Sequence, residues 1–93
     1  MLVFTAKVTV KNGLEDEFAR IMGRAVLKIR QEPGNHAYIF HRSSDHPRTF
    51  MFYEQYTDQA AFEAHRAHLR EMHINLDSYF EGAAEHEYYE LLA

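Results

Sequence analysis

Residues 49–65, TFMFYEQYTDQAAFEAH, combine the two periodicities from which the fold can be inferred, because a strand pattern ends and a helix pattern begins within them. The first nine residues are rich in the aromatic side chains that favour extended strands. Asp58 is well placed to cap a helix, since its side chain can accept a hydrogen bond from a backbone N–H group of the first turn. We therefore predict a strand over residues 49–57 and a helix over residues 59–80, with a potential break before Asn75.

The remaining elements follow from the same two periodicities. Apolar and polar side chains alternate from Leu2 to Lys11, which indicates a strand. Residues 14–29 place their apolar side chains on one stripe of a helix, and Asn12 with Glu15 has the pattern of a capping box. Two further strands are expected, at residues 36–42 and 84–92.

The predicted element order is strand, helix, strand, strand, helix, strand. This order is that of the split βαβ arrangement, a ferredoxin-like α+β fold (βαββαβ) with both helices on one face of a four-stranded antiparallel sheet. The chain has 93 residues and a mass of 11.0 kDa, which is the size of one small domain. We therefore expect a single domain over residues 1–93.

The strands are apolar or aromatic on both faces, unlike the strands of a sheet with one face in water. In the third strand, for example, Phe50, Phe52 and Tyr56 alternate with Met51 and Tyr53. A domain this small buries only about 60–65% of its surface on its own, so packing of the second face in a two-fold dimer is the economical explanation. The alternative is that the tyrosines lie half exposed, with their hydroxyl groups in water.

The composition argues against several classes of function. With 10 Lys+Arg and 14 Asp+Glu residues, the formal net charge of −4 does not fit a nucleic-acid-binding protein. The absence of cysteine removes disulfides, thiolate metal sites and cysteine nucleophiles, and a cytoplasmic location is expected. No stretch reaches the ~20 apolar residues of a membrane helix, and the N-terminal residues lack a signal-peptide core. We expect neither nucleic acid nor a membrane as a partner.

His65 is the polar residue within an otherwise apolar stripe of the second predicted helix. At about 100° per residue, that stripe comprises Phe62, His65, Leu69, Met72 and Leu76. A neutral imidazole on an apolar surface can accept or donate a proton near neutral pH, which makes His65 a candidate general base. The alternative is a core histidine that is hydrogen-bonded to a backbone carbonyl or a carboxylate.

The other histidines show less pattern. His68 lies three residues from His65 and can in principle share a metal ion with it, but no spacing in the chain supplies further ligands, so no metal site is expected. The histidines of the strands and loops are expected at the surface, namely His36, His41, His46 and His86.

Glu54 shares its strand face with three aromatic residues. A carboxylate in such a place is either paired with an arginine or histidine or has a raised pKa. It can be structural, as an ion pair to Arg66, Arg70 or a partner subunit, or it can take part in a reaction. The sequence has neither a glycine-rich phosphate loop nor a serine elbow, so no nucleotide, flavin or nicotinamide cofactor is expected.

Several segments occur in a recognisable order, namely Glu32-Pro33-Gly34 leading to Tyr38, then residues 50–56 (FMFYEQY), then Asp58 and residues 61–65 (AFEAH). In this order they resemble the antibiotic biosynthesis monooxygenase family, which includes the bacterial quinol monooxygenases. The resemblance spans nearly the whole chain. It implies a homodimer with a ferredoxin-like, dimeric α+β barrel fold.

The resemblance also implies oxygenation of a phenolic, quinol or polycyclic aromatic substrate by molecular oxygen, without a metal, flavin or other cofactor. A deprotonated phenol can pass an electron to oxygen itself, so the protein has only to bind it, deprotonate it and exclude water. By the resemblance His65 is the candidate base, and Glu54 orients a partner or holds the helix. The implied pocket wall comprises Phe52, Tyr56, Phe62, Leu69 and Met72.

Two other functions stay open. The family includes an isomerase of a sugar phosphate, and isomerisation of a small enolisable carbohydrate would use the same base without oxygen. The chain can also be a non-catalytic dimeric module for ligand binding or stress, in which His65 is structural. Turnover without oxygen distinguishes the first alternative, and the absence of a ligand-sized pocket beside His65 would favour the second.

Overall fold

The computed structural model describes all 93 residues, Met1–Ala93. The elements in chain order are β1 (Leu2–Thr9), α1 (Glu15–Ile29), β2 (Asn35–Arg42), β3 (Thr49–Tyr56), α2 (Gln59–Glu71), the 3₁₀ helix η1 (Leu76–Tyr79) and β4 (Glu85–Tyr89). The predicted βαββαβ order is confirmed. None of the helices combines the length and the apolar character that crossing a membrane requires.

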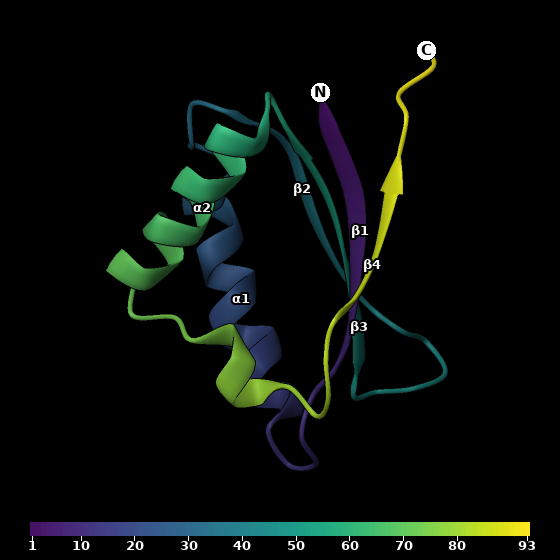
Figure 1. Cartoon of the computed structure of the whole chain (residues 1–93). Coiled ribbons are helices and arrows are strands. Elements are labelled where there is room, and N and C mark those ends of the chain that lie inside the picture. The colour runs from purple at the N-terminus through teal and green to yellow at the C-terminus, as the bar shows by residue number, and fades with distance from the viewer.

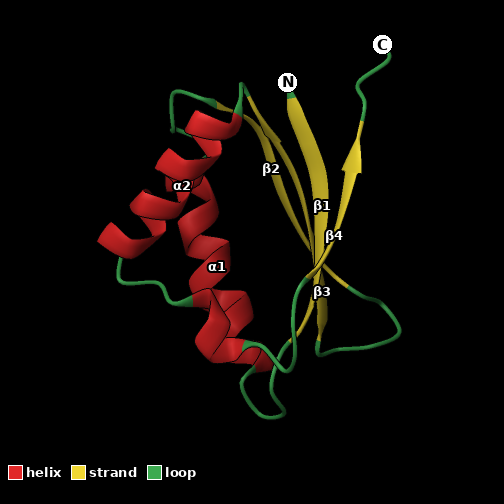
Figure 2. Cartoon of the chain, viewed as in Figure 1, coloured by secondary structure: helices red, strands yellow, loops and turns green.

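The four strands form one antiparallel sheet in the order β2-β3-β1-β4. Both helices lie on one face of this sheet, and the other face carries no helix (Figure 1). The layers are clear in Figure 2, where the red helices stand on one side of the yellow strands. The ferredoxin-like α+β fold with a four-stranded sheet is therefore confirmed.

The core lies between α1 and the helix-facing side of the sheet. The buried residues of α1 are Phe18, Met22, Ala25, Val26 and Ile29. Phe18 is fully buried and packs edge-on against Phe50 of β3, with ring centroids 5.0 Å apart. The predicted apolar stripe therefore faces the core. Ile21, which the helical spacing places on that stripe, is only half-buried, whereas Val26, which the spacing leaves off it, is buried.

Of the two N-caps predicted for the helices, one is confirmed and one is wrong. Asp58 caps α2 as predicted, since its side chain accepts a hydrogen bond of 2.9 Å from the Ala61 N–H. The capping box predicted for Asn12 is wrong, because α1 has Leu14 at its N-cap position and no side-chain cap. Gly13 turns the chain with a φ of 92°, and the Glu15 side chain accepts from the Gly13 N–H instead of the Asn12 N–H.

Helix α2 ends at Glu71, so the break expected before Asn75 is found, whereas the α-helix predicted beyond it is not. His73 adopts a positive φ of 58°, and its N–H donates to the Arg70 carbonyl while the Ile74 N–H donates to the Leu69 carbonyl. This pair of bonds is a Schellman motif, which terminates a helix with a left-handed residue. The chain continues as η1 instead of as more α-helix. The first and last strands are also shorter than predicted, since they end at Thr9 and Tyr89.

The sheet face without helices is less apolar than predicted. Ile39 and Tyr53 lie opposite one another on it, and Ile39 is 44% exposed. The neighbouring strand brings Thr5 opposite Tyr53 and Lys7 opposite Met51. The face therefore has an apolar centre at β2 and β3 and polar side chains on β1.

Candidate functional site

A cavity of about 480 Å³ lies between the sheet and α2. Its lining comes from all four strands, from α2 and from the segment that follows α2, and eleven of its eighteen lining residues are hydrophobic. Two of the polar lining residues are deeply buried, Glu54 at 5% and His65 at 3% exposure. Volume and lining are those of a small-molecule site with a few polar groups in an apolar wall.

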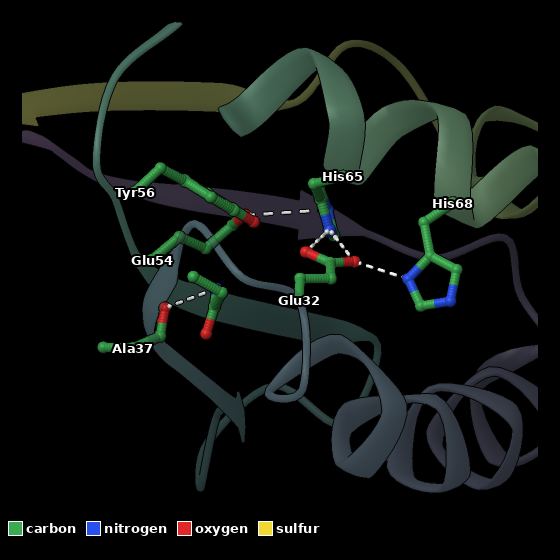
Figure 3. Close-up of polar contacts among 7 residues, drawn as sticks. Glu32, Ala37, Glu54, Tyr56, His65 and His68 are labelled. Atoms are coloured by element: carbon green, nitrogen blue, oxygen red, sulfur yellow. Dashed lines mark hydrogen bonds and ion pairs between the residues drawn. The ribbon is translucent and has the colours of Figure 1, made fainter. Parts of the chain in front are cut away.

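His65 points from α2 toward the sheet, where its ring packs 5.3 Å from that of Tyr56. Its Nδ1 atom lies 3.1 Å from both carboxylate oxygens of Glu32 (Figure 3). Because a carboxylate only accepts hydrogen bonds, Nδ1 must carry the proton, which leaves the Nε2 atom of the neutral ring unprotonated. Burial lowers the pKa of His65, although the Glu32 carboxylate opposes this effect. The neutral ring is therefore favoured near neutral pH.

Glu54 reaches the same place from β3. The Tyr56 hydroxyl donates a hydrogen bond of 2.7 Å to its Oε1 atom, which lies 3.9 Å from Nε2 of His65. Burial raises the pKa of Glu54 from its ordinary 4.5 to about 7, although the Tyr56 hydrogen bond lowers it. The prediction of a histidine partner or a raised pKa thus describes this carboxyl group well. The alternative of an ion pair to Arg66 or Arg70 is wrong, because Glu54 pairs with neither.

Glu32 is a site residue that sequence reasoning missed, since it was noted only as part of the signal that ends the first helix. The loop after α1 is a hydrogen-bonded turn, in which the Glu32 N–H donates to the Ile29 carbonyl. Gly34 lies so close to Ala61 that a side chain at position 34 would overlap the Ala61 methyl group. This close approach brings Glu32 under α2. Its partner His65 is 33 positions away in the chain, so no local pattern could have revealed the pair.

The predicted pocket wall is found in part. Phe52, Phe62 and Leu69 line the cavity, whereas Tyr56 and Met72 do not. Tyr56 is fully buried beside His65, with its hydroxyl group turned to Glu54. Met72 is the C-cap residue of α2, where the helical projection used to place it no longer applies.

Tyr38 and His86 are two of the lining residues that were not predicted. Tyr38 of β2 is 2% exposed, and its ring lies 5.4 Å from that of His65. His86 of β4, expected simply as a surface residue, is exposed but lines the cavity, and its ring lies 5.8 Å from that of Phe4. Strand parity places both side chains on the helix-facing side, but only the sheet order β2-β3-β1-β4 brings them to one cavity.

The histidine cluster has the chemistry of an acid–base site. His65 and His68 both direct Nδ1 to Glu32, and no group of three or more His, Cys, Asp or Glu side chains is placed to hold a metal ion. Burial lowers the pKa of His65 and raises that of Glu54 to about 7, so the imidazole is available as a base while the carboxyl group holds a proton in part near neutral pH. The site therefore offers a base and an acid side by side to a bound molecule.

Comparison with solved structures supports the fold. A protein from Pseudomonas aeruginosa is 23% identical, with a TM-score of 0.84 over 99% of this chain and 94% of that chain. A protein from Nitrosomonas europaea is 23% identical, with a TM-score of 0.86 over 100% of both chains. A structure named as an antibiotic biosynthesis monooxygenase is 22% identical, with a TM-score of 0.81 over 100% of both chains.

No curated protein matches the chain. The antibiotic biosynthesis monooxygenase family model matches residues 1–74, which include α2 and its histidines. This match covers most of the chain. The chain therefore belongs to the antibiotic biosynthesis monooxygenase family.

Proposed function

We propose that the single domain of residues 1–93 is a cytoplasmic, cofactor-independent monooxygenase, which oxidises a phenolic, quinol or polycyclic aromatic substrate with molecular oxygen. The observation that carries this proposal is the contact of His65 Nδ1 with Glu32, which leaves Nε2 as the acceptor of a ring that lines a largely apolar cavity of about 480 Å³. Membership of the family supports the class of reaction. The apolar lining supports the choice of an aromatic substrate, and the absence of cysteine favours the cytoplasm.

The proposed reaction begins when Nε2 of His65 takes the proton of a phenolic hydroxyl group. The electron-rich phenolate passes one electron to oxygen, and the resulting radical and superoxide combine to form a carbon–oxygen bond. Protonation gives a hydroperoxide, and loss of water from it leaves a carbonyl group, so that one oxygen atom enters the product and the other leaves as water. The apolar wall assists by excluding bulk water from the reactive anion.

Glu54 is proposed to return a proton to the peroxide oxygen. Its pKa of about 7 leaves a substantial fraction of the carboxyl group protonated near neutral pH, as a proton donor must be. Tyr56 is assigned to holding Glu54 through its 2.7 Å hydrogen bond. Phe52, Phe62 and Leu69 are proposed to contact the substrate, whereas Met72, which lies outside the cavity lining, supports α2 from the core side.

We further propose that the chain works as a homodimer, which is typical of the family. The open sheet face has an apolar centre in which Ile39 is 44% exposed, and Tyr89 is 47% exposed. The C-terminal residues Leu91 and Leu92 are 53% and 86% exposed. Contact with a second copy would remove this apolar surface from water.

Oxygen uptake with a panel of anthrones and quinols tests the proposed reaction. His65→Gln is expected to lower kcat/KM by about 10²–10⁴-fold, the usual contribution of a general base. The matched control is His46→Gln, in an exposed loop, which should behave as wild type. Circular dichroism of each variant checks the fold. Equal uptake by wild type and His65→Gln would refute the role of His65, and turnover of an enolisable carbohydrate without oxygen would favour the isomerase alternative.

A further inference from the structure

A second hollow lies on the other side of Glu32. It is an open groove of about 800 Å³ between the end of α1 and the first turns of α2, where small side chains such as Ala60, Ala61 and Ala64 leave room. Glu32 and His68 line this groove but not the cavity, whereas His65 lines the cavity but not the groove. The contact between Glu32 and His65 therefore lies between the cavity and the groove.

The side chains at this point form one chain of contacts from the cavity to solvent (Figure 3). His65 Nδ1 lies 3.1 Å from the carboxylate of Glu32, and Oε2 of that carboxylate lies 2.7 Å from Nδ1 of His68. The exposed fraction of the side chain is 4% for His65, 11% for Glu32 and 30% for His68. Only the last member has substantial access to water.

One carboxylate thus serves two imidazoles. In the neutral state each ring must donate its Nδ1 proton to Glu32, because the carboxylate has no proton to give. When one ring gains a second proton, the single negative charge of Glu32 balances it. A second imidazolium at the same carboxylate would have to share that charge and would repel the first.

We propose that Glu32 couples the two histidines: it positions both rings and balances the charge of only one, so that His68 in the groove controls how readily His65 in the cavity takes a proton. Glu32 and His68 are thus positioning residues for the base. The proposal rests on the proposed role of His65, but the coupling is a property of the free protein. A change of pH or an anion in the groove would act on the cavity through it.

Other titratable groups also face the pair. Those packed directly around His65 are Glu32, Tyr38, Glu54 and Tyr56, which come from the loop after α1, from β2 and from β3. The same cavity is also lined by Arg66, Arg70, Asp77 and His86. In the groove, Lys28 of α1 faces the same hollow as His68. These groups stay in place when position 68 is changed, so a comparison of variants isolates the contribution of His68.

The test is a histidine titration by NMR on the full chain without substrate, with ¹⁵N-labelled imidazoles, in wild type, Glu32→Gln, His68→Gln and the surface control His36→Gln. Glu32→Gln is expected to weaken proton binding at His65 by about tenfold or more, because the counter-charge is lost. His68→Gln is expected to strengthen proton binding at His65, because the competing charge of His68 is lost. The expected gain is only about threefold, since solvent screens the partly exposed His68. His36→Gln should leave proton binding at His65 unchanged.

The ¹⁵N shifts give a second readout, which a merely structural role would not move. An amide has one accepting and one donating side, so in Glu32→Gln the two rings can no longer both keep the proton on Nδ1, and one should change tautomer. Proton binding at His65 that is the same in His68→Gln and wild type, with both variants folded, would overturn the coupling. Coupling in a protein without oxygenase activity would overturn the proposed function only.

Discussion

Replacing Glu54 with glutamine should remove the loss of stability that the wild-type protein undergoes as the pH rises. Glu54 is 5% exposed, and burial raises its pKa from 4.5 to about 7. Between these two values the folded chain holds a proton that the unfolded chain has released, so the free energy of unfolding falls as the pH rises. Glutamine resembles the protonated carboxyl group, and its oxygen can still accept the hydrogen bond from Tyr56.

The expected magnitude follows from the size of the pKa change. A rise from 4.5 to about 7 corresponds to about 3 kcal/mol, because a tenfold change in proton binding is worth about 1.4 kcal/mol. Below about pH 5 the variant and wild type should differ little, and above about pH 8 the variant should be more stable by about 3 kcal/mol. For a domain of this size that is roughly 10 °C or more in Tm.

His65 changes the free energy of unfolding with pH in the opposite direction. Burial lowers its pKa below 6.5, so the folded state loses stability as the pH falls and the unfolded chain takes up the proton first. Both proteins contain His65, so the difference between them isolates Glu54 to first order. The assay is urea unfolding followed by circular dichroism at fixed protein concentration, because association would make the apparent stability depend on concentration. The matched control is Glu63→Gln, whose side chain is 55% exposed. If wild type and Glu54→Gln gave parallel stability curves across this pH range, Glu54 would not have the raised pKa on which the reasoning depends.

Three further outcomes are expected. Gly34→Ala should lower the free energy of unfolding by about 1–3 kcal/mol, because the new methyl group would overlap that of Ala61. Gly23→Ala, with open space around it inside α1, should raise the free energy of unfolding by about 1 kcal/mol. Thermal unfolding measures both, and equal effects would contradict the close approach at Gly34. Asp58→Ala should cost about 1 kcal/mol of stability through loss of the N-cap of α2, and an unchanged Tm would argue against that cap. In sedimentation equilibrium, wild type should have about twice the chain mass of 11.0 kDa. Ile39→Lys, which places a charge on the exposed apolar centre of the sheet face, should shift the mass toward that of one chain. A wild-type mass of one chain at micromolar concentration would contradict the dimer.

The elements were predictable because each rests on a local periodicity. The alternation that begins at Leu2 and the stripe that contains Phe18 are properties of neighbouring residues. Element ends were predicted less well, since they depend on single backbone conformations. The left-handed turn at His73, which ends α2 early, has no strong signal in a residue that is neither glycine nor asparagine.

His65 and Glu54 were singled out because each interrupts an apolar pattern on its own element. That interruption shows a buried polar group, but it does not identify the partner. Glu54 proved to lie beside Tyr56 and His65 instead of an arginine. Met72, placed in the pocket by extending the helix, lies outside the cavity lining because the helix ends before it.

The sequence by itself determined the order of the elements, the face that each buries and the two polar residues that stand out from those faces, because these properties repeat over two to four residues. Only the tertiary structure decided that Glu32 joins His65 to His68 and that Tyr38 and His86 line one cavity. The physical reason is distance along the chain. Hydrogen bonds and electrostatic forces act over a few ångströms in space, and groups 33 or more positions apart meet only after the loop at Gly34 has packed against α2.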